Sequence, residues 1–187
     1  MTLHLRAAWL SAALGLALFP AHAQPPAASA ASEVVEVQGG EIRVVTVANG
    51  LVHPWSIAIL PDARTLLVAE RPGRLRIIRN GTLDPEPIWN APPAGDTVEL
   101  KWVALHPRFA ESSLVYVSYP KSGERGTTLA IARGRFDGRK LVDVREIFAA
   151  DAWETGGNMG GKILFGPDET LYVTVGDRDR LCCIGTD

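Results

Sequence analysis

A segment that occurs three times in this chain constrains its fold more than any other feature. The copies are ILPDARTLLVAE at 59–70, LHPRFAESSLVYV at 105–117 and LFGPDETLYVTV at 164–175. In each copy a proline-bearing turn precedes a run of apolar, β-branched or aromatic residues. Repetition at about 40–50 residues, with several short strands per repeat, is typical of β-propellers, whose blades pack radially around an axis. We therefore expect an all-β fold, a β-propeller, of which the chain contains about the first three blades.

Turn signals divide the rest of the chain into short strands. The valine-rich residues 34–48 predict a hairpin with a turn at Gly39-Gly40. Residues 83–96 contain four prolines and are expected to connect two blades without forming strands. The glycine-rich residues 151–161 are expected to form a loop at the mouth of the propeller. The further strands are expected at 55–60, 65–70, 74–79, 101–105, 114–119, 128–136, 144–148, 162–165 and 171–175.

Residues 1–23 have the pattern of a signal peptide. A short basic start is followed by the apolar stretch 7–19 and by small residues up to Ala23. This stretch is shorter than the about 20 residues that span a membrane, so we expect cleavage after Ala23, no stable membrane anchor, and a periplasmic or secreted protein. An uncleaved anchor is the alternative. Residues 24–33 are mostly Gln, Pro, Ala and Ser and are expected to be a flexible linker, and residues 34–187 to form the partial propeller.

The charge of the chain argues against one class of partner. The formal net charge is −2 and the isoelectric point is about 6.1, so the chain has no broadly basic surface. Nucleic acid is therefore not an expected partner. Because the chain stops soon after the third copy, we also expect it to be a truncated portion of a longer propeller and inactive alone.

Three segments resemble the soluble PQQ-dependent glucose/sorbosone (aldose sugar) dehydrogenases, where PQQ is pyrroloquinoline quinone. They are LVHPWSIAILPDARTLLVAERPGRLRII at 51–78, VALHPRFAESSLVYVSY at 103–119 and GGKILFGPDETLYVTVGDRDR at 160–180. The resemblance implies a six-bladed propeller that oxidises the hemiacetal of an aldose to a lactone and passes electrons to a respiratory acceptor. It also implies PQQ on the propeller axis, a histidine base, and a Ca²⁺ whose ligands are expected beyond the end of this chain.

Two positions depart from the family pattern. Asn158 stands at the position of the family's catalytic base, and an amide cannot accept a proton at neutral pH. Before the second copy the family usually has a Gln-Gly-Gly-Leu-like turn whose Gln contacts the site. Here Thr97 opens the matching stretch, and we expect it at that cofactor-contacting position.

The charged turn after the third copy supplies further candidates. Arg178 and Arg180 are suited to the carboxylates of the quinone. Asp177 or Asp179 is suited to the role of a replacement base or an orienter. The alternative is a charged surface turn that pairs with itself. Trp153 and Glu154 are candidate sugar contacts in the glycine-rich loop.

The only cysteines, Cys182 and Cys183, are adjacent. A disulfide between neighbours is strained, and such a bridge after the charged turn would contact the cofactor. Two free thiols, or pairing with another chain, are the alternatives. No His, Cys or carboxylate pair has the spacing of a metal site, so no metal ligand is expected in this chain.

Two other functions remain open. A carbohydrate-binding propeller that has lost its base would retain the scaffold without turnover, and the changes at Asn158 and Thr97 favour it. A lactonase-type propeller would use an axial calcium ion for hydrolysis.

Overall fold

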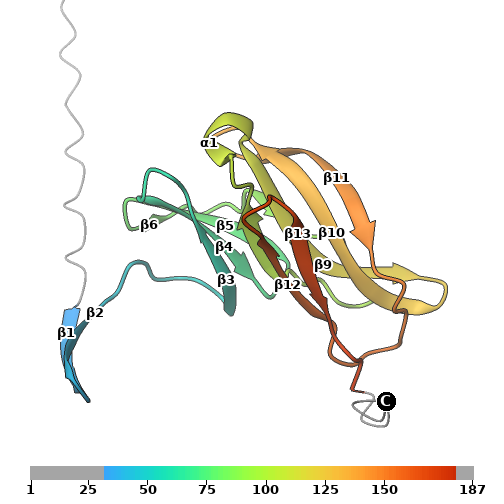
Figure 1. Cartoon of the computed structure of the whole chain (residues 1–187), viewed down its shortest axis with the longest axis horizontal. Helices are drawn as coiled ribbons and strands as arrows, with labels where there is room; N and C mark the ends of the chain where they lie inside the picture. Colours follow the sequence, from blue (N-terminus) through green and yellow to red (C-terminus); the bar gives the residue numbers. More distant parts are fainter. Residues whose placement is uncertain (1–31, 180–187) are drawn as a thin grey trace, which may run out of the picture.

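The computed structural model describes residues 32–179, and almost all of their regular structure is β-strand (Figure 1). The first blade is an antiparallel sheet in the order β3-β4-β5-β6, with β7 also paired to β5. Its strands are β3 (Pro54–Ile59), β4 (Thr65–Glu70), β5 (Arg74–Arg79), β6 (Thr82–Leu83) and β7 (Trp89–Asn90).

The second blade is a four-stranded antiparallel sheet in the order β11-β10-β9-β8, and the third contains the pair β12-β13. A separate hairpin, β1 (Ser32–Val37) with β2 (Gly40–Val45), precedes the blades. The strands of the second and third blades are β8 (Trp102–Leu105), β9 (Leu114–Gly123), β10 (Gly126–Phe136), β11 (Leu141–Ala149), β12 (Gly160–Phe165) and β13 (Leu171–Val175).

The first strands of the three blades lie side by side. β3 packs against β8, and β8 packs against β12. Each sheet then continues away from this inner row through strands that are consecutive in the sequence. This is the radial arrangement of a propeller, so the predicted fold class is confirmed.

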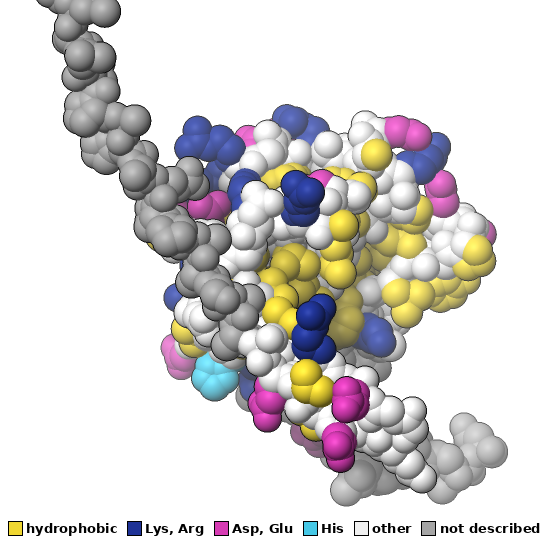
Figure 2. Space-filling model, turned by 90° about the vertical axis from the view of Figure 1, so that its left-hand side faces the viewer, with side chains coloured by type: hydrophobic (Ala, Val, Ile, Leu, Met, Phe, Trp, Pro, Cys, Tyr) yellow, Lys and Arg dark blue, Asp and Glu magenta, His cyan; other side chains and the backbone are white. Residues whose placement is uncertain are grey.

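Alternation along β3 gives the first blade two apolar faces. Trp55, Ile57 and Ile59 point to one side, where Figure 2 shows apolar side chains gathered in a hollow. Ala58 and Leu60 point to the other side and are buried against the second blade. β3 therefore carries apolar residues on both faces, of which only the face toward the second blade is buried.

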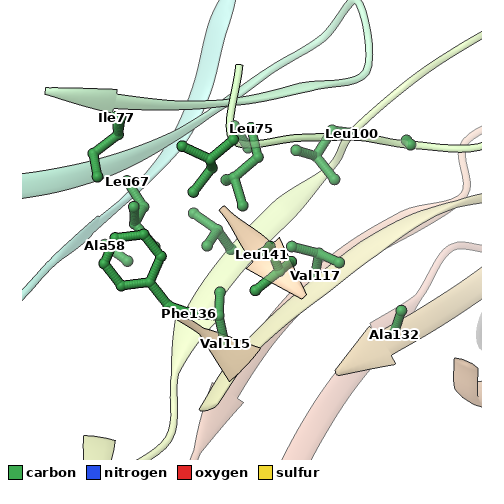
Figure 3. Packing of buried hydrophobic residues seen from close by; sticks show 14 of the residues in the cluster. Ala58, Leu67, Leu75, Ile77, Leu100, Val115, Val117, Ala132, Phe136 and Leu141 are labelled. Atoms are coloured by element: carbon green, nitrogen blue, oxygen red, sulfur yellow. The ribbon is translucent and has the colours of Figure 1, made fainter. Parts of the chain in front are cut away.

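The main hydrophobic core lies between the first and second blades (Figure 3). Leu67, Leu75 and Ile77 of the first blade meet Val115 and Val117 of the second, and all five are fully inaccessible to solvent. A smaller cluster, with Tyr116, Ile131 and Ile163 at its centre, joins the second blade to the third. Each interface between blades is thus a separate dry core.

Buried hydroxyl groups connect the same blades. Ser56 Oγ accepts a hydrogen bond from the backbone N–H of Val103 at 2.9 Å. Ser118 Oγ donates to the carbonyl oxygen of Gly161 at 2.5 Å. Both serines are buried, so these bonds satisfy backbone groups where neighbouring blades meet.

β9, β10, β11 and β12 are each longer than expected from the sequence, and the structure differs further in three segments. β7 lies within residues 83–96, where no strand was expected, because Trp89 packs on the main core. A single helical turn, α1 (Phe109–Ser112), replaces the tight turn in the second copy, since the chain there is longer between the proline and the next strand. β1 begins at Ser32, two residues inside the expected linker, because Ser32 pairs with Val45.

The strands place two sets of connections at opposite ends of the blades. The proline turns and α1 lie at one end, at the top of Figure 1. The longer loops 91–100 and 150–159, the hairpin turn at 124–125 and residues 176–179 lie at the other, which we call the loop end. Within residues 32–179, no helix has the length and apolar character needed to cross a bilayer.

Candidate functional site

Two loops of the third blade meet at the loop end. The backbone N–H of Asn158 donates to Asp179 Oδ2 at 3.1 Å, and the N–H of Arg178 donates to the Asn158 carbonyl at 3.2 Å. The N–H of Gly176 bonds to the Met159 carbonyl. The glycine-rich loop is therefore fastened to the charged turn, with Asn158 beside Arg178 and Asp179.

Glycines make this close approach possible. A Cβ atom on Gly157 would lie 2.6 Å from the Arg178 carbonyl oxygen, and one on Gly176 would collide with the Asn158 carbonyl. Gly157 also has a φ of 78°, which residues with side chains rarely adopt. Larger residues at either position would separate the two loops.

The side chain of Asn158 is used in its own turn. Its Oδ1 accepts a hydrogen bond from the N–H of Gly160 at 3.1 Å, while the residue as a whole is exposed. This hydrogen bond orients the loop. An amide cannot take the proton of a substrate hydroxyl at neutral pH.

The charged turn itself is strained. Arg178 and Asp179 have consecutive positive φ angles of 62° and 59°, a conformation that costs free energy in residues with a Cβ atom. Asp177 Oδ1 accepts a hydrogen bond from the N–H of Asp179, which holds the turn. Asp177 is exposed at the loop end, where a ligand can reach its carboxylate.

Arg178 is the most unusual side chain of the site. It is only 8% exposed, and its Nη2 donates to the Ala152 carbonyl at 2.6 Å. Its Nε and Nη1 are buried and have no hydrogen-bond partner among the residues described. Burial lowers the pKa of the guanidinium below its ordinary value. Two unpaired cationic donors are costly in a protein interior, and a carboxylate would satisfy both.

A cleft of about 340 Å³ adjoins Arg178. Trp153 and Glu154 line it together with Asp177, as does Arg125 from the hairpin between β9 and β10. The Arg125 guanidinium lies over the Trp153 ring at 5.7 Å. The cleft therefore combines an aromatic surface with charges of both signs, which are the groups that bind sugars and carboxylates.

Thr97 lies in a different turn at the loop end. Its hydroxyl donates to the Ala94 carbonyl at 2.9 Å, and its backbone N–H and C=O also bond to Ala94. Two residues on, Glu99 pairs with Arg71 at 3.1 Å and with Lys101 at 2.7 Å. Partial burial opposes ionisation of Glu99, but the hydrogen bonds from Lys101 and Arg71 outweigh it and lower the pKa.

Three predicted residues, Arg180, Cys182 and Cys183, lie outside the described residues. Within residues 32–179, no group of three or more His, Cys, Asp or Glu side chains is arranged to hold a metal ion. The roles of the cysteines and of calcium stay predictions.

The sequence matches the family described as Glucose / Sorbosone dehydrogenase over residues 51–182. This match covers the three blades and both site loops. The chain belongs to the glucose/sorbosone dehydrogenase family. The resemblance inferred from the repeated segments is thereby confirmed.

Individual members of the glucose/sorbosone dehydrogenase family agree with this assignment. An uncharacterized Synechocystis protein is 41% identical over 157 residues, covering 78% of this chain and 38% of the relative. Aldose sugar dehydrogenase YliI of Escherichia coli is 30% identical over 145 residues, covering 74% of this chain and 39% of the relative. This chain thus spans about two fifths of the length of these relatives.

A solved structure resembles the fold. The PQQ-bound form of aldose sugar dehydrogenase from Streptomyces coelicolor superposes with a TM-score of 0.60 at 27% identity. The superposition covers 82% of this chain and 44% of that chain. The family therefore includes a quinone-binding sugar dehydrogenase with the same blade arrangement.

Sequence reasoning missed Arg125. Arg125 comes from the second blade and reaches the cleft only because the hairpin between β9 and β10 lies beside the loop 150–159. The sequence offered Asp179 as a replacement base or an orienter, but it did not indicate the bond to Asn158, which depends on the strained backbone. The cluster of acidic and basic residues after β13 was the available signal.

Proposed function

We propose that this chain forms part of a PQQ-dependent aldose dehydrogenase that oxidises a sugar hemiacetal to a lactone. Membership of the family supports the reaction class, and the buried Arg178 with two unpaired N–H donors is the observation that carries the proposal. PQQ supplies the hydride acceptor in such enzymes. Electrons then pass to a respiratory acceptor, and the signal-like residues 1–23 support export to the periplasm.

The residues present fit one part of the cofactor site. Arg178 suits a carboxylate of PQQ, because an anionic acceptor would satisfy its Nε and Nη1. Trp153 offers an aromatic surface to a sugar ring at the same cleft. We propose Asp177, an exposed carboxylate that lines the same cleft, as the group that takes the proton of the sugar hydroxyl, since Asn158 cannot. We propose that the Ca²⁺ ligands belong to a portion of the longer polypeptide that this chain does not contain.

Asn158 supports a second candidate function. A propeller with an amide at the base position would bind a carbohydrate without oxidising it, and the Asn158 side chain is engaged within its own turn. Such a protein would keep the cleft and lack turnover.

The coding DNA beyond codon 187 and one assay separate the two functions. The enzyme proposal expects a longer polypeptide that reduces a dye with glucose when PQQ and Ca²⁺ are supplied, and no dye reduction by residues 1–187 alone. Sugar binding without dye reduction by the longer protein would favour the binding propeller. A stop codon after Asp187 would contradict the enzyme proposal.

A substitution tests the role of Arg178 in the same protein. Arg178→Met should weaken PQQ binding about 10- to 100-fold, because a hydrogen bond to a charged group contributes about 1.5–3 kcal/mol. Arg139→Met, at the opposite end of the blades, is the control and should bind as the parent does. Quinone absorbance on titration measures both. Equal affinity of the two variants would remove Arg178 from the cofactor site.

A further inference from the structure

The hairpin between β9 and β10 extends past the inner strand of its blade. β9 and β10 have 10 and 11 residues, whereas β8 has four and pairs with β9 no further than Ser118. Residues 119–126 therefore project at the loop end, where Arg125 lines the cleft beside Arg178 (Figure 1). The hairpin, the glycine-rich loop and the charged turn, which form this cleft, all belong to the described part of the chain.

The glycine-rich loop is fixed against this hairpin. The N–H of Thr127 donates to the Glu154 carbonyl at 2.8 Å, and the N–H of Glu154 donates to the Thr127 carbonyl at 3.1 Å. A Cβ atom on Gly126 would lie 2.6 Å from the same Glu154 carbonyl oxygen, and one on Gly123 would collide with the Trp153 ring. The aromatic ring therefore lies directly on the backbone of the hairpin.

Arg125, in the turn of the hairpin, is held in place although it is exposed. Its Nη2 donates to Asp151 Oδ1 at 2.5 Å, and its guanidinium lies over the Trp153 ring at 5.7 Å. The side chains of Arg125 and Asp151 are 68% and 82% exposed, so their ion pair contributes little to stability. Among the described residues Asp151 is the only hydrogen-bond partner of the guanidinium, so its other N–H groups are available to a ligand. A donor that is ordered before the ligand arrives costs less entropy on binding.

The cleft connects this ion pair to the carboxylate proposed as the base. Arg125 and Asp151 line the same cleft as Asp177. Asp177 follows β13 in the third blade, whereas Arg125 belongs to the second, so the cleft runs from the charged turn to the hairpin. A sugar whose C1 hydroxyl is at Asp177 therefore directs the opposite edge of its ring, with the hydroxyls on C4 and C6, toward the hairpin.

We propose that Arg125 and Asp151 recognise the C4 and C6 hydroxyls of the aldose, and that Arg125 is a specificity-determining residue. The guanidinium donates and the carboxylate accepts, and a sugar hydroxyl does both. The two charges are opposite and adjacent, so the pair suits a neutral sugar with free hydroxyls better than a sugar phosphate. The placement of C1 at Asp177 rests on the proposed function, whereas the contact with the sugar applies equally to an enzyme and to a binding propeller.

A substitution and matched sugars test the contact in the longer polypeptide supplied with PQQ and Ca²⁺. Arg125→Met removes the donors. Arg135→Met is the control, because Arg135 forms a similarly exposed ion pair with Asp143 at the opposite end of the blades. Dye reduction is measured with glucose, 4-deoxyglucose and 6-deoxyglucose. Combining the variant with each deoxy sugar isolates the contact between the side chain and the missing hydroxyl.

Arg125→Met should raise the KM for glucose about tenfold, because a hydrogen bond from a charged donor is lost. The value of kcat should stay within about twofold, since the contact is made equally in the ground state and the transition state. With either deoxy sugar the rise should be only about threefold, because one of the two hydroxyls is already absent. Arg135→Met should behave as the parent does with all three sugars.

Two results would overturn the inference. An equal rise in KM for all three sugars would mean that Arg125 acts only by supporting Trp153, without touching either hydroxyl. An unchanged KM for glucose would mean that Arg125 makes no contact with the sugar.

Failure of the proposed function gives a different result, in which no sugar reduces the dye. Calorimetric titration of the same proteins with glucose then tests the contact alone. An affinity about tenfold lower for Arg125→Met than for Arg135→Met would uphold it. Equal affinities, or no binding of glucose by the parent, would overturn it.

Discussion

At the scale of single residues, Glu70 is the most consequential side chain in the first blade. It is fully buried at the end of β4, and its carboxylate accepts from Arg74 Nε at 2.6 Å and from the N–H of Val52 at 2.7 Å. Arg76 lies 3.4 Å away and is itself only 6% exposed. Arg76 Nη2 continues the network to the Asp84 carbonyl. One carboxylate thus joins three segments of the blade.

Glu70→Ala should lower the free energy of unfolding by about 3–5 kcal/mol, because it leaves buried arginine charge without its partner. Urea denaturation followed by tryptophan fluorescence measures the loss. Asp143→Asn removes an ion pair to Arg135 whose side chains are 51% and 72% exposed, and it should cost less than about 1 kcal/mol. If both variants lost a similar free energy of unfolding, the buried ion pairs of Glu70 would stabilise the fold no more than an exposed ion pair does.

At the scale of the elements, three turns at the proline end of the blades use the same device. Asp62, Asp137 and Asp168 each accept backbone N–H bonds from residues two or three positions later. Hydrogen bonds from the Thr65 hydroxyl and the Arg64 N–H lower the pKa of Asp62, and bonds from the Thr170 hydroxyl and N–H lower that of Asp168. Backbone bonds from Lys140 and Arg139 lower the pKa of Asp137.

These carboxylates should make the protein acid-sensitive. Because their pKa values are lower in the folded chain than the ordinary 3.8, their stabilisation is complete above that pH and is lost as the pH falls through the folded values. The Tm should therefore fall below pH 3.8. The triple variant Asp62→Asn, Asp137→Asn, Asp168→Asn keeps acceptors that do not titrate, so its Tm should fall less steeply.

Calorimetry over a pH series checks this expectation. The matched control replaces Glu33, Glu36 and Glu41 of the β1–β2 hairpin by Gln, which changes the net charge equally at exposed positions. If the Tm of the Asn variant fell as steeply with decreasing pH as that of its parent, the three turn carboxylates would not be the cause of the acid sensitivity.

The elements were predictable where local signals and packing agree. The bounds of β4, β5 and β13 match the sequence-based prediction, because each strand runs between a tight turn and a glycine or proline. α1 and β7 were not predictable, since α1 depends on extra length within a turn and β7 on the burial of Trp89 against another blade. Tertiary contacts decide both.

At the scale of the whole molecule, the repeat predicted the propeller and the family, and it predicted the site only in outline. The proximity of Asn158 to Arg178 depends on glycines that allow two backbones to touch, which the sequence marks only as a loop. The Nε and Nη1 donors of Arg178 are unpaired because the side chain is buried against the loop that contains Ala152. Local patterns contain no information about such contacts.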